Sequence, residues 1–233
     1  MSEIATDLME DILMNIAIDG PAGAGKSTIA KLVAGKMGYI YVDTGAMYRA
    51  IALYLIKNEI NVDNDSDVED ACNNIRIEIK YESGVQQVYL NGENVSKEIR
   101  QEQVGNMASK AAAKKAVRDK LLQLQRDIAS ENDVIMDGRD IGTFVLPNAE
   151  LKIYLTASVE TRAKRRFDEL VAKGENPDIK TIEKDIEQRD YQDMNREIAP
   201  LKQAEDAVYL DTSDMSIDEV VADICGKANF ECF

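Results

Sequence analysis

Residues 20–27 carry the strongest chemical signal in this chain. They read Gly20-Pro21-Ala22-Gly23-Ala24-Gly25-Lys26-Ser27, which fits the pattern G-x-x-x-x-G-K-[ST] in full. Glycines let backbone N–H groups wrap around phosphates, and the N-terminus of a following helix adds partial positive charge. In this pattern the lysine reaches the transferred phosphoryl group and the serine hydroxyl ligates Mg²⁺. The segment, extended to Thr28, predicts a nucleoside triphosphate site; the alternative is a glycine-rich turn that binds nothing.

A second candidate is a carboxylate at the end of an apolar run. Residues 134–136 are apolar, and Asp137 follows them directly. An aspartate in this position, as in a Walker B motif, holds Mg²⁺ or its water ligands. Gly138, Arg139 and Asp140 come next and bring further charges to the same loop. The alternative is an ordinary aspartate between strand and loop, beside a solvated arginine.

Arginines form the third candidate set. Arg162, Arg165 and Arg166 are spaced i, i+3 and i+4, so they share one face of a predicted helix. Arg189 and Arg196 lie on either side of Asp193, beyond the next helical stretch. Guanidinium groups clamp phosphate oxygens and neutralise charge in a phosphoryl-transfer transition state. The alternative is a surface helix laced with salt bridges, because acidic residues follow the same stretch.

Length, charge and histidine content limit the function classes. The chain has 233 residues, enough for one sizeable domain with a small insertion. Acidic residues outnumber basic ones by 43 to 28, and the net charge of −15 argues against a nucleic-acid partner. The chain contains no histidine. It therefore has no Ser-His-Asp or Cys-His nucleophile system and no His-ligated metal.

The sequence also predicts a cytoplasmic protein with no membrane partner. No apolar run approaches the roughly 18 residues that a bilayer-spanning helix needs. The first residues include Glu3, Asp7, Glu10 and Asp11, which have the wrong charge for a signal or transit peptide. None of the three cysteines is in a CxxC pair, so a thiolate zinc site is not expected.

Five short apolar runs define the elements that must position these residues. They are residues 14–18, 39–42, 134–136, 151–155 and 207–210, and they are nearly continuous rather than alternating. Such runs are typical of strands buried on both faces of a parallel sheet. Helical patterns separate most of them; one stops at Gly38, and one begins with a capping box at Ser216 and Glu219. The fold class is therefore α/β, with ligands expected at the carboxyl ends of the strands.

Residues 61–95 interrupt this alternation. Ile75, Ile77, Ile79 and Tyr81 alternate with polar residues, and Asn91-Gly92 is typical of a type I′ hairpin turn. The pattern predicts a small antiparallel sheet inserted into the α/β core. We expect an N-terminal extension at residues 1–13, one main domain at 14–228 and a tail at 229–233.

Four motifs in order resemble the bacterial cytidylate kinases, P-loop enzymes of the nucleoside monophosphate kinase family. They are Ile16-Ala17-Ile18-Asp19 continuing through the glycine-rich loop to Thr28, Asp43-Thr44-Gly45-Ala46-Met47-Tyr48-Arg49, Asp137-Gly138-Arg139-Asp140-Ile141-Gly142-Thr143, and Arg189-Asp190 followed by Asp193, Asn195, Arg196, Ala199, Pro200 and Leu201. The resemblance spans roughly residues 14–228. No guanine-reading Asn/Thr-Lys-x-Asp motif is present, so a GTP switch is disfavoured.

The resemblance implies a monomer that transfers the γ-phosphoryl group of Mg²⁺-ATP to CMP or dCMP. It implies a five-stranded parallel sheet, an acceptor-binding insertion at about 61–110 and a helical lid at about 160–200. By matching position, the catalytic residues would be Lys26, Asp137, Arg139, Arg162 and Arg196, with Ser27 and Asp137 on the metal. The CMP phosphate would lie against Arg49, Arg139, Arg196 and Thr44, the sugar against Asp193 and Arg189, and the cytosine against Ser109, Arg118 and Asp140. Arg162, Arg165 and Arg166 match the mobile lid over ATP.

The chemistry of these residues fits a cytosine. Asp140 can accept a hydrogen bond from the N4 amino group, and Arg118 can donate to the acceptor atoms. Uracil would turn an oxygen toward that carboxylate, at a cost of roughly 1–3 kcal/mol. Without the resemblance, Ser109 would be interpreted as a packing residue and Arg118 as a solvated one. Two functional alternatives stay open: a P-loop kinase for UMP, AMP or a shikimate-like acceptor, and a nucleotide-switch ATPase.

Overall fold

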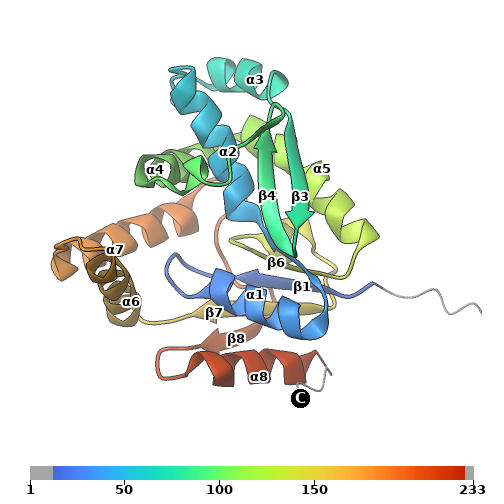
Figure 1. Ribbon diagram of the computed structural model, residues 1–233, viewed down its shortest axis with the longest axis vertical. Helices are drawn as coiled ribbons and strands as arrows, with labels where there is room; N and C mark the ends of the chain where they lie inside the picture. The colour runs from blue at the N-terminus through green and yellow to red at the C-terminus, as the bar shows by residue number, and fades with distance from the viewer. Residues whose placement is uncertain (1–12, 229–233) are drawn as a thin grey trace, which may run out of the picture.

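A five-stranded parallel sheet forms the centre of the molecule in the computed structural model, which describes residues 13–228 (Figure 1). Its spatial order is β2-β6-β1-β7-β8, with every neighbouring pair parallel. The bounds are β1 (Asn15–Asp19), β2 (Ile40–Asp43), β6 (Val134–Gly138), β7 (Leu151–Thr156) and β8 (Val208–Asp211). The α/β class and all five predicted strands are therefore confirmed, and the predicted ranges are a few residues off at most.

Helices cover both faces of this sheet. One face packs against α1 (Lys26–Met37) and α8 (Ile217–Lys227), which lie together beside β1 and β7. The other face packs against α2 (Thr44–Lys57) and α5 (Lys115–Glu131). Along β1 the side chains alternate between the two faces. Ile16 and Ile18 pack in the apolar cluster with α1 and α8, and Ala17 packs in the one with α2 and α5. Burial on both sides explains why the strands are nearly continuous apolar runs.

Two predicted helix boundaries are confirmed. Gly38 ends α1 with a positive φ of 74°, a conformation that glycine adopts without steric cost. Ser216 and Glu219 form the predicted capping box in front of α8. Ile217 is apolar but lies outside the buried face of α8. It is the first residue of α8, and its side chain is 52% exposed.

The inserted segment is an antiparallel sheet of three strands, β3-β4-β5. Both of its turns have positive φ at consecutive residues: 52° and 75° at Ser83 and Gly84, and 50° and 88° at Asn91 and Gly92. The predicted hairpin at Asn91-Gly92 is therefore confirmed. The alternating pattern begins as a strand at Ile77 rather than at Ile75, and a helix that was not predicted precedes it. The bounds are α3 (Asp65–Asn73), β3 (Ile77–Glu82), β4 (Val85–Leu90), β5 (Glu93–Asn94), η1 (Glu98–Arg100) and α4 (Glu102–Ala111).

A helix pair, α6 (Val159–Ala172) and α7 (Ile179–Asn195), lies to one side of the central sheet (Figure 1). It has its own small apolar cluster, in which Ala163 of α6 packs with Ile182 and Ile186 of α7. A single π-helical turn, η2 (Ile141–Val145), follows β6. Within residues 13–228, none of the helices is both long enough and apolar enough to span a membrane. The tail at 229–233 and all of the predicted extension except Leu13 lie outside the described residues.

Candidate active site

The glycine-rich loop connects β1 to α1, as the motif requires, and packs closely against β7. Gly20 has a φ of 149°, and a Cβ there would lie 1.9 Å from the carbonyl oxygen of Leu155. No other residue type fits this position without moving the strand. Gly25 precedes α1 in the left-handed conformation, with a φ of 92°. The loop's path is therefore determined by backbone conformation that only glycine adopts readily.

Lys26 is buried at the first position of α1. Its Nζ donates a hydrogen bond to the carbonyl oxygen of Pro21 at 2.7 Å, which holds the two ends of the loop together. Burial lowers the pKa of Lys26 well below its ordinary value, and the neighbouring Arg139 lowers it further. A carbonyl is a neutral acceptor, so the loop itself leaves the lysine charge uncompensated and available to an anion.

Asp137 ends the apolar part of β6 next to the loop, at the predicted position. Its two carboxylate oxygens accept hydrogen bonds from Ser27 Oγ and from the hydroxyl of Tyr41, each at 2.8 Å. Thr44 Oγ1 donates to the backbone carbonyl of Asp137 at 2.7 Å. Burial, and then the nearby Asp43, raise the pKa of the Asp137 carboxyl. The predicted pair Ser27 and Asp137 is in contact, and Tyr41 is a partner that the sequence did not identify.

Two of the three predicted lid arginines contact the loop. Arg162 donates to the carbonyl oxygen of Ala22 at 3.0 Å, and Arg165 donates to that of Ala24 at 3.4 Å. Arg165 also reaches the carbonyl oxygen of Thr212, which follows β8, at 2.9 Å. The third, Arg166, pairs instead with Glu169 on its own helix at 2.9 Å and stays partly exposed. The spacing predicted a shared face, but only the first two arginines lie against the loop.

A second cluster of arginines lies beyond Asp137, around two buried carboxylates. Asp140 is 4% exposed and pairs with Arg118 and, at 3.1 Å, with Arg196. Asp193 pairs with Arg139 at 2.8 Å. These contacts join α5, η2 and the end of α7, which are far apart in the sequence. The arrangement brings together five of the residues predicted to bind an acceptor.

Two further predicted arginines at this cluster, Arg49 and Arg189, form no ion pair with a carboxylate of residues 13–228. The Nε of Arg189 is buried without a hydrogen-bond partner among the described residues. Burial lowers the pKa of Arg189 to about 10, and the nearby Arg139 contributes. Burial also lowers the pKa of Arg49. A buried guanidinium without a partner is costly, and an anion such as a phosphate would satisfy it.

The two predicted hydroxyl residues, Thr44 and Ser109, differ in burial and in hydrogen bonding. Thr44 is buried and hydrogen-bonded to β6 as described above. Ser109 is half-buried on α4, and no hydrogen bond of its hydroxyl is present among residues 13–228. Two aromatic rings near Arg118 were not predicted: its guanidinium carbon lies 5.8 Å from the ring centre of Tyr48 and 5.6 Å from that of Phe144. Burial raises the pKa of the Tyr48 hydroxyl to about 12, so the ring is neutral.

The inserted sheet is attached to the core at Asp43. The side-chain amide of Gln86 on β4 accepts from the backbone N–H of Asp43 at 2.8 Å and donates to its carbonyl oxygen at 3.1 Å. The Asp43 carboxylate caps α2 through the N–H of Ala46 and pairs with Arg100 at 3.1 Å. Gln86 and Arg100 belong to the inserted segment, and no local sequence pattern predicts where that segment contacts the core. The sequence indicated only that Asp43 is the first residue of the motif that continues to Arg49.

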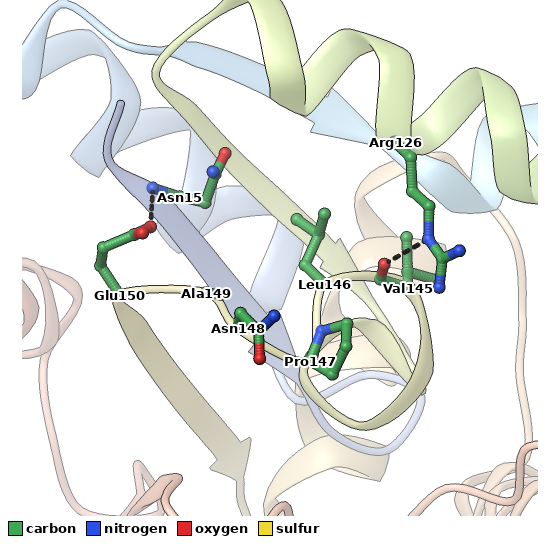
Figure 2. Close-up of a pocket in the computed structure, with 8 residues that line it drawn as sticks. All are labelled: Asn15, Arg126, Val145, Leu146, Pro147, Asn148, Ala149 and Glu150. Atoms are coloured by element: carbon green, nitrogen blue, oxygen red, sulfur yellow. Dashed lines mark hydrogen bonds between the residues drawn. The ribbon is translucent and has the colours of Figure 1, made fainter. Parts of the chain in front are cut away.

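A cavity among the described residues lies at the opposite end of the sheet, beside the amino end of β1. It has a volume of about 460 Å³ and is lined by Asn15, the first residue of β1, and by the segment that leads into β7 (Figure 2). Arg126 borders it and donates to the carbonyl oxygens of Phe144 and Val145. None of the predicted site residues lines this cavity. The candidate active site is therefore the charged region at the carboxyl ends of β1, β2 and β6.

Known proteins with similar sequences identify the family of this chain. The family model for cytidylate kinase matches residues 16–229. A cytidylate kinase of Lactobacillus gasseri is 53% identical over 92% of this chain and 93% of its own length. One of Caldicellulosiruptor saccharolyticus is 53% identical over 89% and 92%.

Among solved structures, an uncharacterized protein from Eubacterium ventriosum aligns with a TM-score of 0.54 at 11% identity, over 94% of this chain and 99% of that one, which shows likeness of fold alone. The match along almost the whole chain and the identity of about one half establish that this protein belongs to the cytidylate kinase family.

Proposed function

We propose that this enzyme transfers the γ-phosphoryl group of Mg²⁺-ATP to CMP or dCMP, giving ADP and CDP or dCDP. The observation that carries the proposal is that β6 ends between two cationic regions. Asp137 contacts the glycine-rich loop, and Asp140, three residues later, is held by Arg118 and Arg196. Two phosphate-bearing substrates bound to these regions would meet at the end of one strand.

The donor triphosphate would occupy the glycine-rich loop. Its oxygens would replace the loop carbonyls as partners of Lys26, Arg162 and Arg165, which already converge there. The backbone N–H groups at the start of α1 would add further donors. Because Lys26 and Arg165 donate to neutral carbonyls, binding an anion would exchange weak partners for charged ones, whereas Arg162 would keep its ion pair with Asp190.

The residues present at Asp137 fit a magnesium ion. Ser27 Oγ and an Asp137 oxygen lie 2.8 Å apart, which places a hydroxyl and a carboxylate side by side. Among residues 13–228 there is no group of three or more acidic, cysteine or histidine side chains that would hold a metal alone. Mg²⁺ commonly keeps several waters and binds through one or two protein groups together with phosphates. When bound, the ion would neutralise charge on the triphosphate.

The acceptor would bind in the second cluster. Arg49, Arg139 and Arg196, with Thr44, would hold its phosphate, and Arg189 with Asp193 would contact its sugar. Asp140 would accept from the cytosine N4 group while Arg118 donates to the ring acceptors. Ser109, on α4, would complete the base contacts. The excess of guanidinium groups over carboxylates in this cluster suits a dianionic phosphate.

Catalysis would rest on positioning and charge neutralisation. The attacking phosphate oxygen of a nucleoside monophosphate is already ionised at neutral pH and needs no strong base. An enzyme without histidine is therefore equipped for this reaction. The contact of Arg162 and Arg165 with the loop would exclude water and limit loss of the phosphoryl group to hydrolysis.

The proposal is tested by following ADP release with Mg²⁺-ATP and each of CMP, dCMP, UMP, AMP, GMP and shikimate. Turnover concentrated on CMP and dCMP is expected. Preference for another acceptor would overturn the assignment of the base contacts, and ADP release without acceptor would indicate a nucleotide-switch ATPase. The Lys26→Ala variant, purified in parallel, controls for contaminating kinases. Light scattering on the same samples should give a monomer mass near 25.9 kDa.

A further inference from the structure

Asp19 is a buried carboxylate whose role none of the site assignments covers. It is the last residue of β1, the central strand, and it directly precedes Gly20 of the glycine-rich loop. Its side chain is 5% exposed. One oxygen accepts the backbone N–H of Ile141 at 2.8 Å, and the other accepts the backbone N–H of Gly142 at 2.7 Å.

Packing alone would favour an apolar residue, not an acid, at this buried position. Burial raises the pKa of Asp19 to about 6, although its two backbone hydrogen bonds lower it and Lys26 also opposes the rise. The other charged group that faces it, Asp140, raises the pKa further. A carboxylate that is costly to ionise directly follows the apolar residues 16–18 of β1. The cost of burying this carboxylate indicates that its two hydrogen bonds, to the backbone N–H groups of Ile141 and Gly142, have a structural role.

The two peptides that it holds directly follow Asp140. Asp140 has backbone angles of φ −148° and ψ 26°, outside the regular regions, as the chain turns from β6 into η2. Fixing the N–H groups of Ile141 and Gly142 fixes this turn, and with it the direction of the Asp140 side chain. The turn has little free space: a Cβ on Gly142 would lie 3.1 Å from Cδ of Lys152 and 3.5 Å from an Asp19 oxygen.

We propose that Asp19 is a positioning residue that holds the Arg139–Asp140 turn in register with the glycine-rich loop, so that the acceptor pocket forms at a set place relative to the donor site. The inference rests on the proposed function, because it assigns the acceptor to this turn. Asp19 touches neither substrate. It acts through the backbone on one side and through its covalent link to Gly20 on the other.

The test is Asp19→Asn, which preserves shape but replaces one acceptor oxygen with an NH₂ group that faces a backbone N–H. We expect the Kd for CMP, measured by calorimetry without ATP, to rise about 10-fold or more, because one buried hydrogen bond becomes a clash of donors. The Kd for ATP without CMP should stay within about threefold. In steady state the KM for CMP should rise far more than the KM for ATP.

The matched control is Asp133→Asn. Asp133 also accepts a backbone N–H across two strands, that of Met14 at 2.6 Å, but at the amino end of β6. It should leave both dissociation constants unchanged. In the NMR spectrum of Asp19→Asn, the amide protons of Ile141 and Gly142 should move upfield as they lose a charged acceptor, and those of the loop glycines should move less.

A second variant keeps the test open if Asp19→Asn does not fold. Gly142→Ala would crowd the same turn against Lys152 while the Asp19 carboxylate is kept. It should also weaken CMP binding more than ATP binding. Equal weakening of CMP and ATP binding, or unchanged CMP binding in a folded variant, would overturn the positioning role. If the wild-type protein itself fails to bind CMP, the proposed function fails instead, so the two failures are distinguishable.

Discussion

The donor and acceptor regions hold their cations in different ways. At the glycine-rich loop, Lys26 and Arg165 donate to backbone carbonyl oxygens, and Arg162 donates to the carbonyl oxygen of Ala22 while it also pairs with the Asp190 carboxylate at 2.6 Å. At the acceptor cluster, Arg139 and Arg118 are paired with the carboxylates of Asp193 and Asp140. A carbonyl orients a cation without cancelling its charge, whereas a carboxylate does both. The proposed donor site would therefore keep more of its charge for a triphosphate, with Arg162 alone of the three paired to a carboxylate, and the proposed acceptor site would use part of its charge for shape and base selection.

Removing the donor lysine should have the largest effect. Lys26→Ala should lower kcat by about 10³-fold or more, because the cation nearest the transferred group is lost. The melting temperature of the ligand-free protein should change little, since Lys26 contributes one hydrogen bond to a carbonyl of its own loop. Coupled ADP release and calorimetry measure the two. Lys36→Ala, in the exposed last turn of the same helix, is the control. A large, cooperative loss of melting temperature would contradict the role given to Lys26.

The dependence of the donor site on backbone is tested by Gly20→Ala. The added Cβ would meet the carbonyl oxygen of Leu155 at 1.9 Å, so β7 or the loop must move. We expect a loss of about 3 kcal/mol in unfolding free energy and loss of ATP binding. Gly35→Ala is the matched control, because its Cβ would meet nothing within 4 Å in the interior of α1. It should raise stability by about 0.5–1 kcal/mol. Urea unfolding measures both, and equal effects would show that the contact with Leu155 does not matter.

Between the two regions, Asp19 makes stability depend on pH. Its folded-state pKa of about 6 lies above the ordinary 3.8, so the native state binds the proton more tightly than the unfolded chain does. The stabilisation by this proton is complete below about pH 4 and lost as pH rises through 6, and it amounts to about 3 kcal/mol. Asp19→Asn should remove this part of the pH dependence. Urea unfolding of both proteins at several pH values between 4 and 7 gives the difference, and parallel curves would refute the shift.

The smallest effect is expected on acceptor choice. Asp140→Ala should erode the preference for CMP over UMP by roughly 1–3 kcal/mol, because the acceptor for the N4 amino group is lost. ATP affinity should be nearly unchanged. Arg118 and Arg196 would lose their shared partner, so the melting temperature should also fall. Asp168→Ala, which breaks an exposed pair with Lys164 on α6, is the control. An unaltered ratio of kcat/KM for CMP and UMP would show that Asp140 does not read the base.

Local patterns were sufficient for much of the fold and for the donor loop. Five apolar runs, the stop at Gly38 and the capping box at Ser216 depend on neighbouring residues, and each is confirmed. The motif at residues 20–27 specified its own geometry because glycine conformation is a local property. The resemblance to cytidylate kinases supplied the acceptor residues, and the family membership that it predicted is confirmed.

The remaining parts of the site depend on tertiary contacts. Tyr41 reaches Asp137 only because β2 pairs with β6, and Gln86 reaches Asp43 only because the inserted sheet docks there. Asp19 looked like the polar end of an apolar strand, and its partners are more than 100 residues away in the sequence. Arg166 differs in the other direction: helical spacing groups it with Arg162 and Arg165, but in this structure it pairs with Glu169 on its own helix.

The separate apolar cluster of α6 and α7 has a consequence for dynamics. Ala163, Ile182 and Ile186 pack with one another and not with the two clusters that cover the sheet. Such a helix pair behaves as its own cooperative unit, so its amide hydrogens should exchange with solvent through local openings far less costly than global unfolding. Few apolar contacts would be broken when the pair moves as a body. How often the pair leaves the glycine-rich loop would then depend on a few polar contacts: those of Arg162 and Arg165 with the carbonyl oxygens of Ala22, Ala24 and Thr212, and the ion pair of Asp193 with Arg139.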